Sequence, residues 1–281
     1  MILVTGATGT VGREVVGLLV KDGQKVRAMT RDPKKARFDP KVEVVAGDFA
    51  RPETLEKAAQ GAEAVFSLST GPELGAHEGA LARAAKKAGA KRLVKLSVMG
   101  AGSGGENVIV KWHDAGEKAI RESGLAWTFV RPGTFMSNAL QWAPTVKAQG
   151  KVFLPYGDGK VAPVHPRDIA AVAVKALTSP GHEGKAYTLT GPEAFGVADE
   201  LRVLSEEVGK PIQYVPVPDE AAKAGMLQAG MPLVLVEALL KMAGVIRSGG
   251  AAAVLPTVEQ VLGRPGLTWR EWAKENAAAF R

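Results

Sequence analysis

The stretch Thr5-Gly6-Ala7-Thr8-Gly9-Thr10-Val11-Gly12 begins at the end of a predicted strand (residues 2–5) and opens a predicted helix (11–21). Gly6 permits a tight turn, Gly9 lets an anion come against the backbone, and Gly12 lets the helix pack closely on the strand. The first helical turn also directs unpaired N–H groups and the positive end of the helix dipole at the loop. The alternative is a generic strand-to-helix turn. The predicted pyrophosphate contacts are Gly6, Thr8, Gly9, Thr10 and Val11.

Short apolar runs alternate with helix-period stretches through the first half of the chain. The runs are rich in Val, Leu and Ile without alternating in polarity, which is typical of strands buried on both faces of a parallel sheet. Strands that alternate with helices build βαβ units, so we predict an α/β fold with a Rossmann-type, doubly wound parallel sheet. Its further strands are predicted at 26–30, 42–46, 64–68, 93–98 and 126–131, and its further helices at 55–59, 76–88 and 110–123.

The pattern changes after Pro132, where the predicted segments are mainly helical and are interrupted by Gly and Pro. We predict a first domain at 1–149, to which 161–190 returns, and a smaller, mainly helical substrate-binding lobe at 150–281. Asn138, Trp142 and Tyr156 are candidates for a substrate pocket. Apolar residues of this kind would serve equally as the ordinary core of the lobe.

Composition narrows the classes of partner. The chain of 281 residues has no Cys, which excludes disulfides, Cys-ligated metals and a Cys nucleophile. No two of its four histidines have the spacing along the sequence that is typical of a pair of metal ligands, so we expect no bound metal. The net charge of +7 suits an anionic partner, although a solvated basic surface is the alternative. Aromatic residues make up only 6% and are not interleaved with basic ones, so no nucleic acid is expected.

We expect a cytoplasmic protein that does not enter a membrane. Met1 runs directly into apolar residues without a basic leader segment. The most apolar later stretch, 231–246, is short and is interrupted by Pro232, Glu237 and Lys241. The sequence leaves the oligomeric state open, with a homodimer as one alternative.

The end of the second predicted strand bears on the choice of dinucleotide. Arg31 stands there, and its planar guanidinium can face a 2′-phosphate, which favours NADP(H). Asp32 is the counter-evidence, because a carboxylate at this place holds the ribose of NAD(H). Asp48 and Phe49 follow the third strand and are candidates for adenine contacts, with a helix cap as the alternative for Asp48.

Several motifs together resemble the NmrA-like group of atypical short-chain dehydrogenase/reductases, which includes type-2 NADPH quinone oxidoreductases and triphenylmethane-dye reductases. They are the glycine loop, Arg31, Gly47-Asp48-Phe49, Arg131-Pro132-Gly133 and Asp168-Ile169-Ala170. The resemblance implies a Rossmann domain with a small substrate lobe, and a 2′-phosphate contact for Arg31. It further implies adenine contacts from Asp48 and Phe49, ribose contacts from Leu68, Ser69 and Thr70, and nicotinamide contacts from Pro132 and Gly133.

Most short-chain reductases carry Tyr-x-x-x-Lys on the helix corresponding to 110–123, where the phenol protonates the new alkoxide. His113 and Glu117 occupy those two places here, as in the quinone-reductase branch. We therefore expect the chain to lack the Tyr–Lys pair, both on this helix and after any of its three tyrosines, Tyr156, Tyr187 and Tyr214. His113 is expected to orient the substrate or the ribose, with Glu117 fixing its tautomer, and a structural helix-face pair is the alternative. Ser97 is a further candidate, with a strand-end cap as its alternative.

A quinone, a cationic dye or another conjugated acceptor takes up hydride without a strong acid, because its product is a stabilised anion or a neutral molecule. The sequence therefore predicts an NADPH-dependent reductase that transfers hydride to a quinone-like, apolar acceptor. The alternative is a non-catalytic regulator that senses NADP(H).

Overall fold

The computed structural model describes all 281 residues, which form two compact units. Unit 1 comprises Met1–Pro132 and Pro166–Leu189, and unit 2 comprises Gly133–His165 and Thr190–Arg281. The first boundary therefore falls at Pro132 and not at the expected residue 149. The reason is that Met136, Ala139 and Val146 pack in the hydrophobic core of unit 2.

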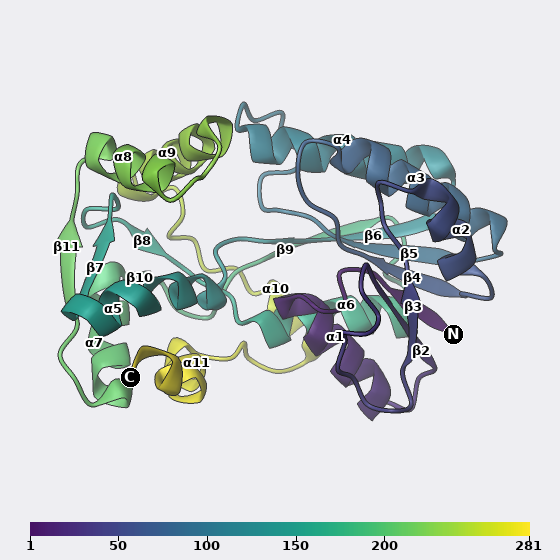
Figure 1. The fold of residues 1–281 in the computed structure, drawn as a ribbon, viewed down its shortest axis with the longest axis horizontal. Helices are drawn as coiled ribbons and strands as arrows, with labels where there is room; N and C mark the ends of the chain where they lie inside the picture. Colours follow the sequence, from purple (N-terminus) through teal and green to yellow (C-terminus); the bar gives the residue numbers. More distant parts are fainter. The chain divides into compact units, whose positions relative to one another are not determined.

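Unit 1 is built on a parallel sheet of seven strands in the order β3-β2-β1-β4-β5-β6-β9 (Figure 1). The sheet grows from β1 in one direction through β2 and β3, and in the other through β4 to β9, so β1 and β4 mark the point where the strand order reverses. This arrangement confirms the predicted Rossmann-type, doubly wound fold. The strands are β1 (Ile2–Val4), β2 (Val26–Thr30), β3 (Glu43–Ala46), β4 (Ala64–Ser67), β5 (Arg92–Leu96), β6 (Ala126–Pro132) and β9 (Lys185–Leu189).

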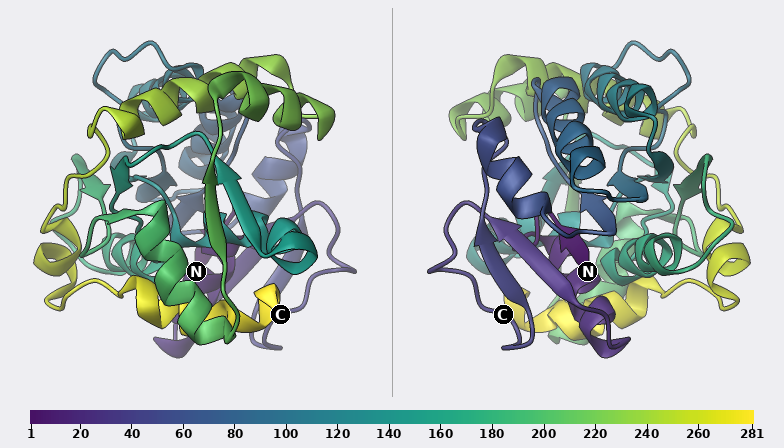
Figure 2. Two further views of the ribbon diagram at one scale, coloured as in Figure 1. Left: turned by 90° about the vertical axis from the view of Figure 1, so that its left-hand side faces the viewer. Right: turned by 90° about the vertical axis from the view of Figure 1, so that its right-hand side faces the viewer.

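Helices cover both faces of this sheet. On one face lie α1 (Thr10–Lys21) and α6 (Pro166–Thr178), and on the other lie α2 (Pro52–Ala59), α3 (Leu74–Lys87) and α4 (Val108–Ser123). The right-hand view of Figure 2 shows the blue α2 and α3 on the opposite side of the strands from the purple α1. Leu3, Val65 and Leu93 of adjacent strands are fully buried against the α2–α4 layer, as continuous apolar strands require.

Unit 2 is mainly helical and packs around Trp269, Trp272 and Phe280. Strand β7 pairs with β11 in parallel, as the left-hand view of Figure 2 shows, and β8 pairs with β10 in the antiparallel sense. Both β8 and β10 are two residues long, too short for any sequence periodicity to predict them.

The elements of unit 2 are η1 (Met136–Trp142), α5 (Ala143–Gln149), β7 (Lys151–Leu154), β8 (Lys160–Val161), β10 (Phe195–Gly196), α7 (Val197–Val208), β11 (Gln213–Pro216), α8 (Asp219–Gln228), α9 (Leu233–Arg247), α10 (Thr257–Leu262), α11 (Trp269–Asn276) and η2 (Ala277–Phe280). None of the helices in the structure combines the length and the apolar character needed to span a bilayer.

Candidate cofactor and catalytic site

The predicted site residues of unit 1 gather at one edge of the sheet. Parallel strands end at the same edge, and there Gly6 follows β1, Arg31 follows β2, Asp48 follows β3, Leu68 follows β4 and Ser97 follows β5. In open α/β sheets, ligands bind outside the carboxyl ends of the strands where the strand order reverses, which here is between β1 and β4.

The glycine loop is held against the end of β4. Gly6 has a φ of +59°, a conformation that glycine adopts without strain. A Cβ on Gly12 would lie 2.8 Å from the carbonyl carbon of Gly6 and closer still to its oxygen, so the turn closes only over a glycine. The backbone N–H of Leu68 donates to Thr5 Oγ1 at 2.9 Å, which ties the start of the loop to the neighbouring strand.

The loop leaves the first turn of α1 uncapped. Gly9 is the N-cap residue, and no side chain bonds the free N–H groups that follow it. The first turn contains no acidic residue, and Thr8, Gly9 and Thr10 are exposed. A Cβ on Gly9 would meet only Gly6 O, at 3.3 Å, so the outer side of the loop is open to an approaching group. Uncapped amides and an open glycine surface fit a dinucleotide pyrophosphate.

The end of β2 presents a free guanidinium. Arg31 is exposed and makes no ion pair or side-chain hydrogen bond within the chain. Asp32, in contrast, accepts a hydrogen bond from the N–H of Lys34 at 3.1 Å and lies 3.4 Å from Lys35 Nζ. The carboxylate that would favour NAD(H) is therefore engaged by its own turn, whereas the guanidinium that would face a 2′-phosphate is available.

Asp48 and Phe49 form the turn after β3. The Asp48 carboxylate accepts from the N–H of Ala50 at 3.0 Å and does not cap α2, whose N-cap residue is Arg51. The ring of Phe49 lies 5.3 Å from that of His77 and packs on the core of unit 1. Both residues lie at the carboxyl edge, and their adenine contacts stay a prediction.

A buried lysine that the sequence did not predict, Lys95, contacts His113. Lys95 lies on β5 and is fully buried, on the same side of the sheet as Leu93. Its Nζ donates to the carbonyl of Leu96 at 2.9 Å, lies 3.2 Å from His113 Nδ1 and lies 3.5 Å from Glu78 Oε1. The sequence signal is a charged residue between Val94 and Leu96 in a buried strand.

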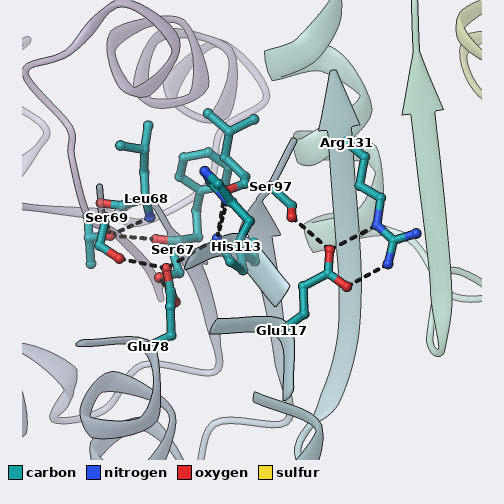
Figure 3. A network of polar contacts seen from close by, with 12 residues as sticks. Ser67, Leu68, Ser69, Glu78, Ser97, His113, Glu117 and Arg131 are labelled. Carbon is teal, nitrogen blue, oxygen red and sulfur yellow. Dashed lines mark hydrogen bonds and ion pairs between the residues drawn. The ribbon is translucent and has the colours of Figure 1, made fainter. Parts of the chain in front are cut away.

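Glu78 of α3 is the counterion of Lys95 and is also fully buried. Its carboxylate accepts hydrogen bonds from the hydroxyls of Ser67 and Ser69, the latter at 2.9 Å (Figure 3). The hydroxyl of Ser69, predicted to face the ribose, is therefore engaged by Glu78, while the neighbouring Thr70 is exposed.

Burial and the contact with Lys95 together set the charge of His113. Burial and the neighbouring positive charge of Lys95 lower the pKa of His113 to about 3, so the ring is neutral near pH 7. Its Nδ1 faces Lys95 Nζ at 3.2 Å. His113 Nε2 makes no hydrogen bond within the chain. The expectation that Glu117 fixes the tautomer of this ring is wrong, because the Glu117 carboxylate bonds Ser97, Arg121 and Arg131 and not His113.

Glu117 is instead the centre of a second buried network, drawn in Figure 3. Its carboxylate accepts from Ser97 Oγ at 2.7 Å, from Arg131 Nε at 2.8 Å and from Arg121 Nη2 at 3.0 Å. The hydrogen bond to Glu117 raises the pKa of Arg131. The sequence predicts no site role for Arg131 beyond the Arg131-Pro132-Gly133 motif.

The remaining predicted residues lie at the end of β6 and in unit 2. Pro132 is the buried last residue of β6, and Gly133 is the first residue of unit 2. Asn138 is exposed on η1. Trp142 lies 6.3 Å from the ring of Trp269, between ring centroids, at the edge of the unit 2 core.

The expectation that the chain lacks a Tyr-x-x-x-Lys sequence is wrong, because Lys160 stands four residues after Tyr156. The two do not form the pair of the short-chain reductases. Tyr156 lies in the turn after β7, whereas Lys160 is exposed at the start of β8, so no helix face brings them together. Burial, together with the nearby Glu200, raises the pKa of Tyr156, the opposite of what the catalytic pair requires.

No group of three or more His, Asp or Glu residues is arranged to hold a metal ion.

Comparison with known proteins agrees with this geometry. Residues 6–180 match the protein family described as NAD(P)H-binding, which spans more than half of the chain. The chain belongs to this family. A solved structure of an NADPH-dependent quinone oxidoreductase from Escherichia coli, complexed with NADPH, superposes with a TM-score of 0.85 at 28% identity, covering 98% of this chain and 99% of the other. This likeness places the family member in the NmrA-like group of atypical short-chain dehydrogenase/reductases.

Two curated relatives are more similar in sequence to this chain than the quinone oxidoreductase is. It is 44% identical to (4-alkanoyl-5-oxo-2,5-dihydrofuran-3-yl)methyl phosphate reductase from Streptomyces griseus, over 100% of this chain and 99% of the relative. It is 42% identical to an NAD(P)H azoreductase from Xenophilus azovorans, with the same coverage. The family member is accordingly an NAD(P)H-dependent oxidoreductase.

Proposed function

We propose that the protein is an NADPH-dependent reductase of conjugated, electron-poor acceptors, among them quinones. The observation that carries this proposal is the chemistry of α4. Where a carbonyl reductase has Tyr and Lys, this helix has a neutral His113 and a Glu117 that is bound to Ser97, Arg121 and Arg131. A neutral imidazole gives up its proton only with difficulty, and Glu117 is occupied by its three partners, so the site suits acceptors whose negative charge is delocalised as it forms.

The relatives support the same class of acceptor. One is named for an azo compound, one for a dihydrofuran that carries an alkanoyl and an oxo group, and one for a quinone. These compounds share a conjugated, electron-poor double-bond system. A site that selects for this electronic property and not for one functional group accounts for all three.

The cofactor, when bound, supplies the hydride. In our proposal the free N–H groups at the start of α1 bind its pyrophosphate, and Arg31 binds its 2′-phosphate. His113 donates a hydrogen bond from Nε2 to the acceptor atom on which negative charge develops. Because the pKa of His113 is about 3, it acts as a neutral donor and not as an imidazolium acid.

The test is oxidation of NADPH by the purified protein with a panel of acceptors: a naphthoquinone, an azo dye, a triphenylmethane dye, an alkanoyl butenolide and an unconjugated ketone. We expect turnover with at least one conjugated acceptor and none with the ketone. Turnover of the ketone alone would overturn the proposal. Tight NADPH binding without turnover of any acceptor would also overturn it, and would favour an NADP(H)-sensing regulator.

The Arg31→Gln substitution tests the choice of cofactor. Loss of a charge-assisted hydrogen bond to the 2′-phosphate costs about 1.5–3 kcal/mol, so the Kd for NADPH should rise ~10- to ~100-fold. The Kd for NADH should stay within about twofold, because NADH has no 2′-phosphate. Isothermal titration calorimetry measures both constants. Arg83→Gln removes the same charge from the exposed surface of α3 and is the control; equal effects of the two variants would refute a role for Arg31.

A further inference from the structure

Lys95 is a charged residue at a fully buried position, where an apolar residue would be expected. It lies within β5, an interior strand of the sheet, and its side chain is fully buried and makes no contact with solvent. Burying an ammonium is costly, and a hydrophobic residue of similar volume is often at least as stable in such a place. Burial lowers the pKa of Lys95, and Glu78 acts in the opposite direction. The lysine therefore calls for an explanation other than stability.

We propose that Lys95 is a positioning residue that holds His113 in the Nε2–H tautomer, so that the ring is a permanent hydrogen-bond donor toward the acceptor. The inference rests on the proposed reductase function and extends it to a residue outside the His113/Glu117 pair. Lys95 touches neither the cofactor nor the acceptor in this account and acts only through His113.

The geometry around the ammonium favours one tautomer of His113. An ammonium has three N–H donors, and Lys95 has three acceptors: Leu96 O at 2.9 Å, His113 Nδ1 at 3.2 Å and Glu78 Oε1 at 3.5 Å. A proton on Nδ1 would place two donors against each other and leave one N–H of the ammonium without an acceptor. That arrangement is costly for a buried charge.

The surrounding residues hold Lys95 in this position. Glu78 lies on α3, and its carboxylate is held in place by hydrogen bonds from the hydroxyls of Ser67 and Ser69. Gly116 of α4 leaves room for the lysine stem, since a Cβ there would lie 3.1 Å from Lys95 Cε and closer still to Leu74.

Charged groups near His113 come from β5, from α3 and from its own helix α4, where the adjacent Asp114 accepts from the N–H of Gly102 at 2.6 Å. Lys95 faces His113 from β5, Glu78 lies behind Lys95 on α3, and Glu117 is on its own helix α4 but is committed to Arg131. No carboxylate therefore bonds His113 directly, and the ring does not become an imidazolium in the range where an ordinary histidine titrates. We expect the reductase rate to show no ionisation of His113 between about pH 5 and about pH 8.

The experiment is NMR of protein labelled with nitrogen-15 in its four histidines, recorded without cofactor; a His113→Gln variant assigns the His113 signals. In the wild type we expect a protonated Nε2, an unprotonated Nδ1 and no titration over that range. In Lys95→Met/Glu78→Gln, which removes both charges together, we expect a mixture of tautomers and a pKa shifted upward toward the ordinary value of 6.5. Lys87→Met, at an exposed lysine, is the control and should leave the signals unchanged.

Kinetics give a second readout. The double variant should lose kcat in proportion to the rings that leave the Nε2–H tautomer, about twofold for an equal mixture, and keep its KM for NADPH within about twofold. A wild-type His113 that carries its proton on Nδ1, or a double variant with the same tautomer as the wild type, would overturn the inference. The NMR result does not depend on turnover: a fixed Nε2–H tautomer in a protein that reduces no acceptor would leave the inference standing and refute only the proposed function.

Discussion

The Gly12→Ala substitution should abolish cofactor binding and lower the free energy of unfolding by about 1–3 kcal/mol or more. Its new Cβ would lie 2.8 Å from the carbonyl carbon of Gly6 and 2.9 Å from the Cα of Ala7. Both are backbone atoms, so relief requires the loop itself to move away from the helix. That movement would displace the N–H groups that we assign to the pyrophosphate. Urea unfolding measures the stability, and calorimetric titration with NADPH measures the binding.

Gly17→Ala is the matched control in the same helix. No atom lies within 4 Å of a Cβ added at Gly17, so the substitution should only improve helix propensity, by up to about 1 kcal/mol. It should leave the Kd for NADPH unchanged. If Gly12→Ala bound NADPH as tightly as Gly17→Ala, the close approach of loop and helix would not be what forms the binding site.

The Glu117→Ala substitution should lower the free energy of unfolding by about 3–5 kcal/mol, the range typical of removing one partner from a buried ion pair. The carboxylate is 1% exposed and binds two arginines and Ser97. Its removal would leave the half-buried guanidinium of Arg131 without its carboxylate partner, and the Ser97 hydroxyl without an acceptor. Thermal or chemical unfolding monitored by circular dichroism checks the effect.

Glu122→Ala supplies the comparison on the same helix. Glu122 is exposed and lies 3.8 Å from Lys118 Nζ, so its loss should cost less than about 0.5 kcal/mol. Should Glu117→Ala prove as stable as Glu122→Ala, the network around Glu117 would not stabilise unit 1, and a direct role for Glu117 in the reaction would regain support.

The sheet of unit 1 could be predicted from the sequence because its elements are coded locally. Buried parallel strands appear as apolar runs, and the glycine loop has a fixed position between β1 and α1. The boundary between the units could not be predicted in the same way. The segment that contains η1 and α5 has a helical pattern in either domain, and only its packing on Val152, Leu204 and Trp269 assigns it to unit 2.

The contacts of Lys95 with Glu78 and His113 could not be predicted from the sequence for a related reason. Lys95 meets Glu78 and His113, which are 17 and 18 residues away on α3 and α4, so no spacing within one element brings them together. The error over Tyr156 and Lys160 illustrates the converse. A spacing of four residues indicates a shared face only within a helix, and these two residues lie in a turn and a strand.

The most direct test of the account is a crystal structure of the protein grown with saturating NADP⁺. We predict that the pyrophosphate lies against the backbone N–H groups at the start of α1, that the 2′-phosphate meets the Arg31 guanidinium, and that His113 Nε2 points to the region beside the nicotinamide. A dinucleotide bound away from the carboxyl edge of the sheet, or crystals without bound dinucleotide under these conditions, would contradict the central claim.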